Sequence, residues 1–434
     1  MSHSCIVGGG ITGLAAAWDL TQAGFSVTVL EREDSLGGLA ASFDAGGYAL
    51  ERFYHHWFTS DTHIIGLIEE LGLGERLVSR ESRTGMYYAN TLFRLSNPLD
   101  LLRFTPLPFV DRLRLGLLVP VARSVRDWRR LEGVTARDWL VRTCGENVYR
   151  VVWEPLLRGK FGDVADEISA VWLWNKLCLR GGSRAKSGAE VLLYFDGGFG
   201  ALVDGIRDAL VARGVEIRTG DGARALEVRD GAAVAVLAES GRIPCDNVLV
   251  TTPLPIAADL LGDHLDEAEA ARLRRIRYLA NICLVLELRE SLSELYWINV
   301  NDPSFPFVGV IEHTNFEPVG SYGGRHIVYL SRYLPQNDAT YHLSDEEYLA
   351  YALGFLRRMF PAFRDDAIIA SHVWRADYAQ PIVERDYSAL VPPMHTSLRN
   401  VVVSSMAQIY PEDRGTNYAV RGGREAAALV AELP

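Results

Sequence analysis

Three glycines near the start of the chain have the spacing of a dinucleotide-binding turn. The apolar run 5–7 leads into Gly8, Gly10 and Gly13, and the alanine-rich stretch 14–20 follows. The first glycine permits a tight turn, the second lets the backbone approach a pyrophosphate, and the third lets a helix pack closely on the strand. The free N–H groups at the start of that helix would face the phosphates. This turn predicts binding of NAD or FAD.

A carboxylate follows at the position that a ribose hydroxyl would require. The second apolar strand, 27–30, ends on Glu31, at roughly the twenty-residue offset typical of this acid. A glycine pattern alone is weak, because glycine turns without a ligand are common. Here strand, turn, helix, strand and acid occur in order, which favours a cofactor site. A second glycine pair, Gly37-Gly38, comes shortly afterwards.

The run from Gly8 to Gly38 resembles the N-terminal FAD motif of the flavin-containing amine oxidases. Protoporphyrinogen oxidases, phytoene desaturases and UDP-galactopyranose mutases have similar motifs. In these families the glycine pair lets the chain pass the diphosphate and the flavin. The resemblance therefore implies FAD and not NAD.

Two later blocks resemble further FAD segments of the same families. The first, 194–200, precedes a helical pattern and several strands. The last of these strands leads into residues 251–253, which return to the FAD in the families that the chain resembles. The second combines the strand 400–403 with the segment 415–420 and an alanine-rich helix. The resemblance points the N-terminus of this helix at the flavin pyrimidine, where its positive end would stabilise the anionic reduced flavin.

The C-terminal block departs from the family pattern in one respect. The usual Gly-Asp or Gly-Glu after the strand is replaced by Ser404-Ser405-Met406, so Asp413 is the candidate for the missing acid. No cysteine lies in this block, and we expect the FAD to be bound non-covalently. The cofactor contacts that the motifs imply are Gly8, Gly10, Ile11, Thr12, Gly13, Glu31, Arg32, Gly37, Gly38, Leu39, Ala40, Ala223, Thr252, Gly415, Asn417 and Tyr418.

Two adjacent histidines, His55 and His56, lie where related desaturases and mutases run a similar stretch beside the flavin. His56 is the better match to that stretch and is the catalytic candidate, with His55 assigned to the substrate. Histidine titrates near neutral pH and could move a proton while the flavin takes a hydride. The alternative is a structural histidine that holds the loop by hydrogen bonds.

Three polar residues precede the flavin-facing helix. Tyr410, Asp413 and Arg414 would lie close to the isoalloxazine ring if that helix docks as the resemblance implies, and all three are catalytic candidates. Arg414 could either pair with Asp413 or bind an anionic group of the substrate.

The substrate cavity has three further candidate contacts. The segment 154–162, which includes Lys160, resembles a protoporphyrinogen oxidase segment that ends near the substrate. Lysine is rare in this chain, although a lysine on a surface loop is the alternative explanation. The segment 374–381 is similar to a family strand that lines the cavity, and Tyr378 and Gln380 are its candidates.

The arrangement of these blocks predicts an α/β fold with two domains. The resemblance implies a discontinuous, Rossmann-like FAD-binding domain of the GR2 type, which would comprise residues 1–78, 190–265 and 391–434. An α+β substrate-binding domain would comprise residues 79–189, expected to be mostly helical, and 266–390. The length of 434 residues agrees with two domains.

Composition excludes several other classes of protein. A net charge of −11 argues against nucleic-acid binding, which needs clustered positive charge. The five scattered cysteines include no C-x-x-C pair, and the histidines show no metal-ligand spacing, so neither a disulfide framework nor a metal site is expected. No signal peptide and no membrane-spanning run is evident, which favours a cytoplasmic protein. The oligomeric state stays open.

One basic, apolar segment leaves a choice open. Between residues 104 and 128, arginines are interleaved with an apolar face formed at helical spacing by Leu113, Leu117, Val121, Val125 and Trp128. We expect this face to be the buried side of a domain helix. The alternative is a basic helix that lies on anionic lipid as a peripheral membrane contact.

These features predict an FAD-dependent oxidoreductase that abstracts a hydride from a C–H bond of a small amine, hydroxyl-bearing or conjugated hydrophobic molecule. No second glycine fingerprint follows Gly13, so oxygen or a quinone is the expected electron acceptor. One alternative is a redox-neutral flavin isomerase like UDP-galactopyranose mutase. The other is a non-catalytic binding protein like the GDP-dissociation inhibitors, which the intact glycine turn and Glu31 disfavour.

Overall fold

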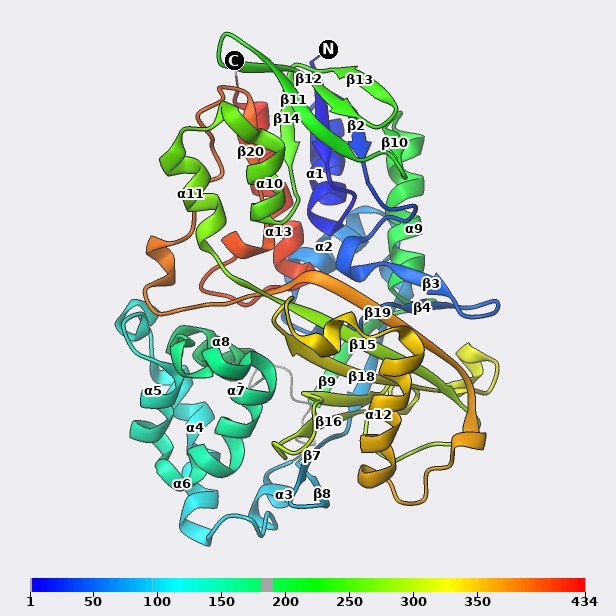
Figure 1. Ribbon diagram of the computed structural model, residues 1–434, viewed down its shortest axis with the longest axis vertical. Helices are drawn as coiled ribbons and strands as arrows, with labels where there is room; N and C mark the ends of the chain where they lie inside the picture. Colours follow the sequence, from blue (N-terminus) through cyan, green and yellow to red (C-terminus); the bar gives the residue numbers. More distant parts are fainter. Residues whose placement is uncertain (1, 96, 181–189, 434) are drawn as a thin grey trace.

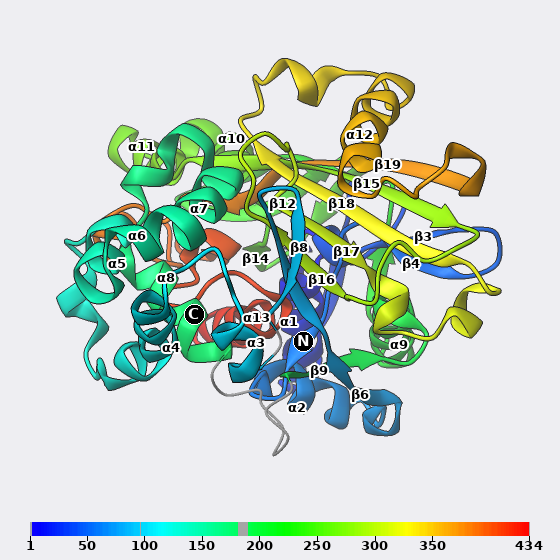
Figure 2. The ribbon, with the colours of Figure 1, turned by 90° about the horizontal axis from the view of Figure 1, so that it is seen from below.

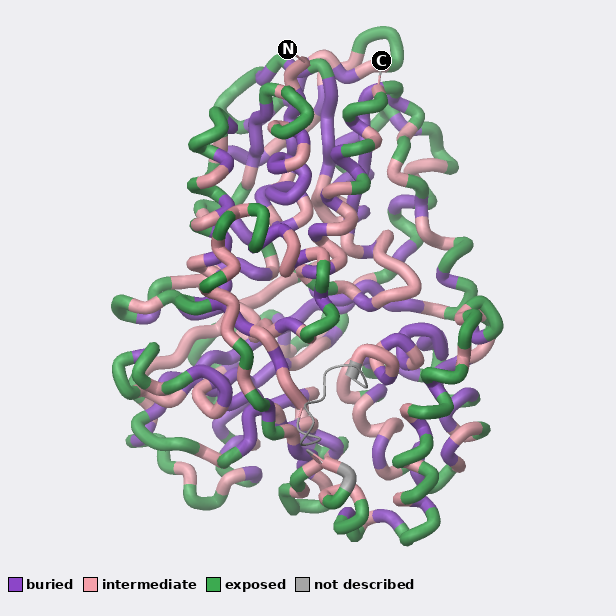
Figure 3. Tube along the Cα trace, turned by 180° about the vertical axis from the view of Figure 1, so that it is seen from behind, coloured by how far each residue is buried: buried purple, intermediate pink, exposed green. Residues whose placement is uncertain are grey.

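A computed structural model of the chain describes residues 2–95, 97–180 and 190–433. Figure 1 shows two stacked parts, of which the upper carries both chain termini and the lower combines a large sheet with a group of helices. Seen from behind in Figure 3, buried chain runs through the middle of each part. The sheets thus form the centre of both parts.

A five-stranded parallel sheet lies in the middle of the upper part. Each of its four strand pairings is parallel, and the strands come from three separate stretches of the chain. Their order is β10 (Glu216–Arg218), β2 (Ser26–Leu30), β1 (His3–Val7), β14 (Asn247–Val250) and β20 (Val401–Val403). This arrangement confirms the predicted discontinuous, Rossmann-like fold.

The two faces of this sheet are covered by different elements, because alternate residues of a strand point to opposite faces. Ile6, Val29 and Leu249 pack with three helices: α1 (Ile11–Gln22), α9 (Gly198–Ala212) and α13 (Thr416–Ala431). Their neighbours Val7 and Val248 pack against a small antiparallel sheet and a helix: β11 (Ala223–Arg229), β12 (Ala232–Ala238), β13 (Gly241–Pro244) and α10 (Leu254–Leu261). Both faces are therefore buried, as in other parallel sheets.

Glycines allow α1 to lie unusually close to its neighbours. A Cβ atom built on Gly13 would lie 2.1 Å from the carbonyl oxygen of Gly8, and one built on Gly423 in α13 would lie 2.3 Å from that of Thr12. Any larger residue would push apart the elements that form the glycine turn.

The lower part is built around a mixed seven-stranded sheet. Its order is β19 (Ile368–Pro381), β15 (Tyr278–Leu288), β18 (His326–Leu334), β17 (Gly309–Glu312), β16 (Trp297–Val300), β7 (Thr84–Tyr88) and β8 (Thr91–Arg94). Ile282 and Leu284 pack on one face against α12 (Asp345–Met359), whereas Cys283 and Val285 face the core of the upper part. The parallel pairing of β16 with β7 joins the two long insertions.

Helices from the first insertion lie beside this sheet, at the lower left and bottom of Figure 1, and α4–α8 lie to the left of the sheet in Figure 2. They are α3 (Pro98–Leu102), α4 (Phe109–Ser124), α5 (Ala136–Cys144), α6 (Glu146–Val148), α7 (Glu154–Phe161) and α8 (Ala170–Arg180). The remaining elements are β3 (Ser42–Asp44), β4 (Ala49–Glu51), β5 (Trp57–Phe58), α2 (Thr62–Glu70), β6 (Leu77–Ser82), β9 (Glu190–Phe195) and α11 (Glu267–Arg275). The parallel sheet takes its strands from residues 1–78, 190–265 and 391–434, and the mixed sheet takes its strands from 79–189 and 266–390. We therefore propose the predicted domain boundaries.

The predicted burial of the apolar face between residues 104 and 128 is wrong for three of its five residues, whereas Val125 and Trp128 are half-buried against the core. Within α4, Leu113, Leu117 and Val121 are exposed, and the helix instead buries the side that carries Leu118 and Ala122. The helix has apolar residues on both sides, so its pattern does not identify the side that packs.

Candidate active site

The first turn of α1 is open to a ligand. Gly8 adopts a φ of 113°, which favours glycine, and the Thr251 hydroxyl donates to its carbonyl oxygen over 3.0 Å. Gly10 immediately precedes the helix and has no side chain that could cap it. The N–H groups of residues 11–13 therefore keep their capacity to bind an anion such as a diphosphate.

Glu31 is held in place for recognition at the end of β2. One carboxylate oxygen accepts from the Gly9 N–H over 2.8 Å, and the other accepts from the Glu33 N–H over 2.9 Å. Each carboxylate oxygen can accept more than one hydrogen bond. Glu31 can thus bind ribose hydroxyls while the backbone fixes its orientation.

The second glycine pair passes directly beside the first turn. The Gly37 N–H donates to the carbonyl oxygen of Gly9 over 2.9 Å, and Gly37 also forms a parallel bridge with Gly10. A Cβ atom on Gly38 would lie 3.4 Å from Cα of Gly10. The two segments therefore meet backbone to backbone, which suits the close passage of an extended cofactor.

The start of α13 is tied to the segment that contains the two histidines. The indole N–H of Trp57 donates to the Thr416 hydroxyl over 2.7 Å. The side-chain oxygen of Asn417 accepts from the N–H groups of His63 and Ile64, at the start of α2. This side chain thus caps α2, and the predicted contact of Asn417 with the cofactor stays a prediction.

A polar group of five residues, which we call the Asp413 cluster, gathers just before α13. Its members are Lys176 of α8, Tyr333 of β18, Gln380 of β19, and Asp413 and Arg414. The Lys176 ammonium lies 2.5 Å from Asp413, and Arg414 donates to the Gln380 side-chain oxygen over 3.1 Å and to the Tyr333 hydroxyl over 2.7 Å. The cluster joins the helical group, the large sheet and the C-terminal block.

Asp413 is negatively charged throughout the physiological range. Burial alone would raise its pKa, but the charges of Lys176, Lys160 and Arg414 hold that pKa well below its ordinary value. Lys160 also lies over the rings of Trp172 and Tyr333, at 4.8 and 5.3 Å from their centroids. The predicted residues Lys160, Gln380, Asp413 and Arg414 are therefore brought together.

His55 lies near this cluster as a neutral imidazole. Burial lowers its pKa to about 4, and the charge of Arg414 acts in the same direction. Its Nδ1 atom lies 2.5 Å from the carbonyl oxygen of Phe53, which can only accept. Nδ1 must then carry the proton, so Nε2 is left as an acceptor.

The other candidates have contacts outside the cluster. Nδ1 of His56 lies 2.9 Å from the Tyr296 hydroxyl. Tyr410 donates to a Glu132 carboxylate oxygen over 2.8 Å, and the ring of Tyr378 packs edge-on against a neighbouring tyrosine. Burial and then Glu132 raise the pKa of Tyr410. The roles predicted for these three residues stay predictions.

The remaining predicted cofactor contacts are spread along the upper part. Arg32 is exposed and pairs with Glu33, whereas Leu39 and Ala40 lie in the short helical turn after Gly37. Ala223 opens β11, Thr252 follows β14, and Tyr418 lies in the first turn of α13 beneath the Arg421 guanidinium.

Sequence reasoning missed two members of the Asp413 cluster, Lys176 and Tyr333. Lys176 was detectable only through its rarity, because the chain contains three lysines. Tyr333 carried no comparable signal, because tyrosine is common in strands.

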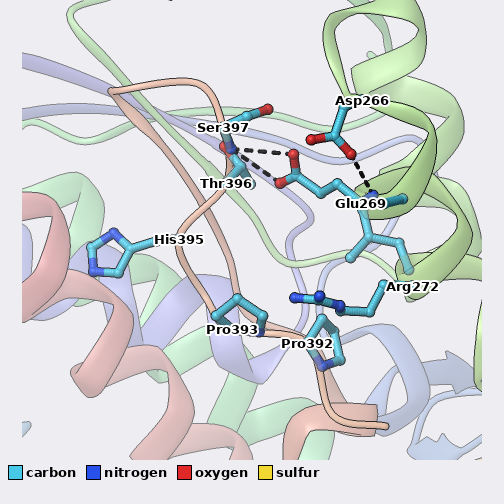
Figure 4. Close-up of a pocket in the computed structure, with 10 residues that line it drawn as sticks. Asp266, Glu269, Arg272, Pro392, Pro393, His395, Thr396 and Ser397 are labelled. Carbon is cyan, nitrogen blue, oxygen red and sulfur yellow. Dashed lines mark hydrogen bonds between the residues drawn. The ribbon is translucent and has the colours of Figure 1, made fainter.

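A surface hollow elsewhere has polar residues that already have structural roles. It lies between α11 and the loop 392–397 (Figure 4). Both carboxylate oxygens of Glu269 accept from the Ser397 N–H, and Asp266 accepts from the Glu269 N–H over 2.7 Å to cap α11. Across the described ranges, no group of His, Cys, Asp and Glu is placed to hold a metal ion.

A family model for flavin containing amine oxidoreductases matches residues 11–431. The chain belongs to this family. A coproporphyrinogen III oxidase of Propionibacterium freudenreichii subsp. freudenreichii is 31% identical over 178 residues, which cover 38% of this chain and 33% of that protein. A match over one third of the relative's length does not transfer its activity.

Solved structures of similar fold align with nearly the whole length of this chain. A putative protoporphyrinogen oxidase from Exiguobacterium sp. 255-15 has a TM-score of 0.78 at 20% identity and covers 99% of this chain and 98% of its own. Reduced UDP-galactopyranose mutase has a TM-score of 0.76 at 15% identity, with 99% and 95% covered. At such identities these likenesses show the fold alone.

Membership of the family makes this protein a flavin-containing oxidoreductase, with FAD as its cofactor. The residues present fit that cofactor. The open first turn of α1 suits the diphosphate, Glu31 suits the ribose, and the paired glycines at 37–38 let their own segment pass close to the glycine turn. Bound FAD supplies the hydride-accepting group, and the protein supplies binding, orientation and electrostatics.

Proposed function

We propose that this flavoprotein oxidises a small molecule carrying an anionic group, by hydride transfer from a C–H bond beside nitrogen or oxygen or within a conjugated system. The observation that supports the proposal is the position of Arg414, which lies two residues before α13 and belongs to the Asp413 cluster. Two of its five N–H donors are used by the neutral acceptors Gln380 and Tyr333. Further donors can therefore bind a carboxylate or phosphate.

His55 supplies a complementary contact in this proposal. Its neutral ring presents Nε2 as a hydrogen-bond acceptor, suited to an N–H or O–H group of the substrate. The N-terminus of α13 adds a positive dipole end, which favours negative charge on the reduced cofactor. We propose non-covalent attachment of the FAD because residues 391–434 contain no cysteine.

The proposal is tested by anaerobic mixing of the purified yellow protein with a panel of primary amines, hydroxy acids and coproporphyrinogen III. We expect an anionic compound to bleach the flavin, and oxygen or a quinone to restore the colour. Acid precipitation should leave all the flavin in the supernatant. Turnover that requires pre-reduced flavin, with a product isomeric to the substrate, would instead establish a mutase-like isomerase. A colourless protein that cannot be reconstituted would establish a binding protein.

A further inference from the structure

The outer side of α4 exposes five large apolar side chains, which we call the α4 apolar face. Phe109, Val110, Leu113, Leu117 and Val121 are between 40% and 61% exposed. Leu118 and Ala122 are buried on the opposite side, and the carbonyl oxygen of Ala122 accepts from the indole N–H of Trp174 over 2.8 Å. α4 is thus anchored to α8 by one side while its other apolar side faces outward.

This exposure is concentrated in one region of the molecule. Of the eleven large hydrophobic residues exposed in the described part of the chain, eight lie between residues 92 and 121. Leu99 and Leu102 of α3 continue the patch, and Arg112 ties α4 to α3 by donating to the Leu102 carbonyl oxygen over 2.5 Å. Figure 1 places α3 and α4 at the end of the molecule opposite the two termini. Patches of this kind mark interaction sites.

Arginines border the apolar face on both sides. At 3.6 residues per turn, the exposed apolar residues of α4 occupy one arc of the helix, with Arg112 and Arg123 along one edge and Arg114 along the other. Residues 97–130 contain seven arginines and three aspartates, whereas the whole chain has a net charge of −11. Arg114 pairs with Asp111, and the segment that contains this face still has four more positive than negative side chains.

We propose that the α4 apolar face docks on an anionic lipid surface, with the helix lying in the plane of the membrane interface. A basic amphipathic helix with apolar residues on its outer side and arginines at its edges suits both the acyl boundary and anionic headgroups. No helix in residues 2–95, 97–180 and 190–433 is long and apolar enough to cross a membrane. The contact proposed is peripheral.

Charge favours lipid over a second copy of the chain as the occupant. A symmetric dimer through this face would bring the same patch of each copy together, and so set arginine against arginine. Anionic headgroups would neutralise those arginines. Through Trp174 and Lys176, α8 connects the docking face to the Asp413 cluster, so the lipid-bound helix belongs to the same unit as the candidate active site.

The test is vesicle flotation of the full-length holoprotein. Vesicles of phosphatidylcholine alone are compared with vesicles of phosphatidylcholine and phosphatidylglycerol, at low and at high salt. We expect binding to the anionic vesicles that weakens as salt rises. A Leu113→Asp, Leu117→Asp double variant should bind at least about tenfold more weakly, because both apolar contacts with lipid are lost.

The matched control is Val211→Asp on α9, a residue that is similarly exposed but lies outside the patch. It should bind vesicles as the unchanged protein does. Flavin absorbance and thermal midpoints check that the variants are folded. A second variant, Arg123→Glu at the edge of the face, should reduce the preference for anionic vesicles.

Three results would overturn the proposal. The first is no binding to anionic vesicles, and the second is equal binding to both kinds of vesicle. The third is a dimer, seen by sedimentation velocity, that the Leu113→Asp, Leu117→Asp variant dissociates. That last result would assign the face to a second copy of the chain.

Discussion

The side-chain ammonium of Lys176 lies 2.5 Å from a carboxylate oxygen of Asp413. The pair joins α8, in the first insertion, to the turn that leads into α13 at the end of the chain. Asp413 is almost completely buried, whereas the Lys176 side chain is 36% exposed. Removal of the lysine would leave a buried carboxylate with one fewer positive charge nearby, so the pair should matter for stability as well as for the site.

Lys176→Met should lower the free energy of unfolding by about 1–3 kcal/mol. This is less than a fully buried pair would lose, because solvent reaches the lysine. Urea unfolding at pH 7 measures the change. Lys176→Arg, which keeps the charge, should lose less, and Asp413→Asn should cost less in the Lys176→Met background than alone. Equal stability of Lys176→Met and the unchanged protein would show that the pair contributes nothing.

Asp61 should make stability fall as pH rises through the weakly acidic range. Burial raises its pKa to about 6 from 3.8, against the opposing effects of the Phe58 N–H and Lys176. Because the folded protein binds this proton more tightly, the stabilisation is complete below 3.8 and is lost as pH rises through 6. Asp61→Asn should remove this slope, which amounts to up to about 3 kcal/mol.

Urea unfolding of both proteins at several pH values tests the prediction. The effect is separable from that of Asp413, whose lowered pKa gives the opposite sign: its stabilisation is present above the ordinary value of 3.8 and is lost as pH falls below it. Parallel pH profiles for Asp61→Asn and the unchanged protein would contradict the assignment.

Gly423→Ala should destabilise the protein by about 1–3 kcal/mol and weaken FAD binding. The added methyl group would press on the backbone of Thr12 in the first turn of α1, which cannot give way as a flexible side chain can. Thermal unfolding and flavin retention on a desalting column measure the two effects.

Gly354→Ala in α12 is the matched control. Its Cβ atom would meet no neighbour within 4 Å, so alanine should raise stability by up to about 1 kcal/mol through helix propensity. If Gly423→Ala behaves like this control, the close contact of α13 with α1 is not required.

Arg414→Ala should raise KM for the oxidised substrate by about 10- to 100-fold, with a smaller change in kcat. A hydrogen bond from a charged group to the anion would be lost in the substrate complex and the transition state alike. Steady-state kinetics with a compound that bleaches the flavin supply both constants. Arg421→Ala removes a guanidinium that pairs with Glu412 and should leave KM nearly unchanged. An unchanged KM for Arg414→Ala would show that Arg414 does not bind the substrate.

The sequence was sufficient where the chemistry depends on residues close together in the chain. The glycine turn, the start of α1 and the carboxylate of Glu31 all follow from spacing within residues 8–31, because one strand–turn–helix–strand unit brings them together. The discontinuous sheet could also be predicted, but from the three segments that resemble FAD blocks of the amine oxidases. Local order was enough for the first strand–turn–helix–strand unit alone.

The Asp413 cluster required the tertiary structure. Asp413 and Arg414 could be singled out from their place before the C-terminal helix, but Lys176 and Tyr333 come from distant elements. No periodicity or spacing relates a lysine on α8 to an aspartate near the end of the chain. Only the packing of the helical group against the sheet brings these charges into contact.

The orientation of α4 shows the same division. The sequence predicted a helix with apolar residues and arginines within residues 104–128, but apolar residues occupy two sides of the helix that forms. Helical periodicity specifies which residues share a side and not which side meets the core. That choice depends on α8, whose Trp174 donates to the carbonyl oxygen of Ala122. The side of α4 that carries Leu113 and Leu117 is left exposed.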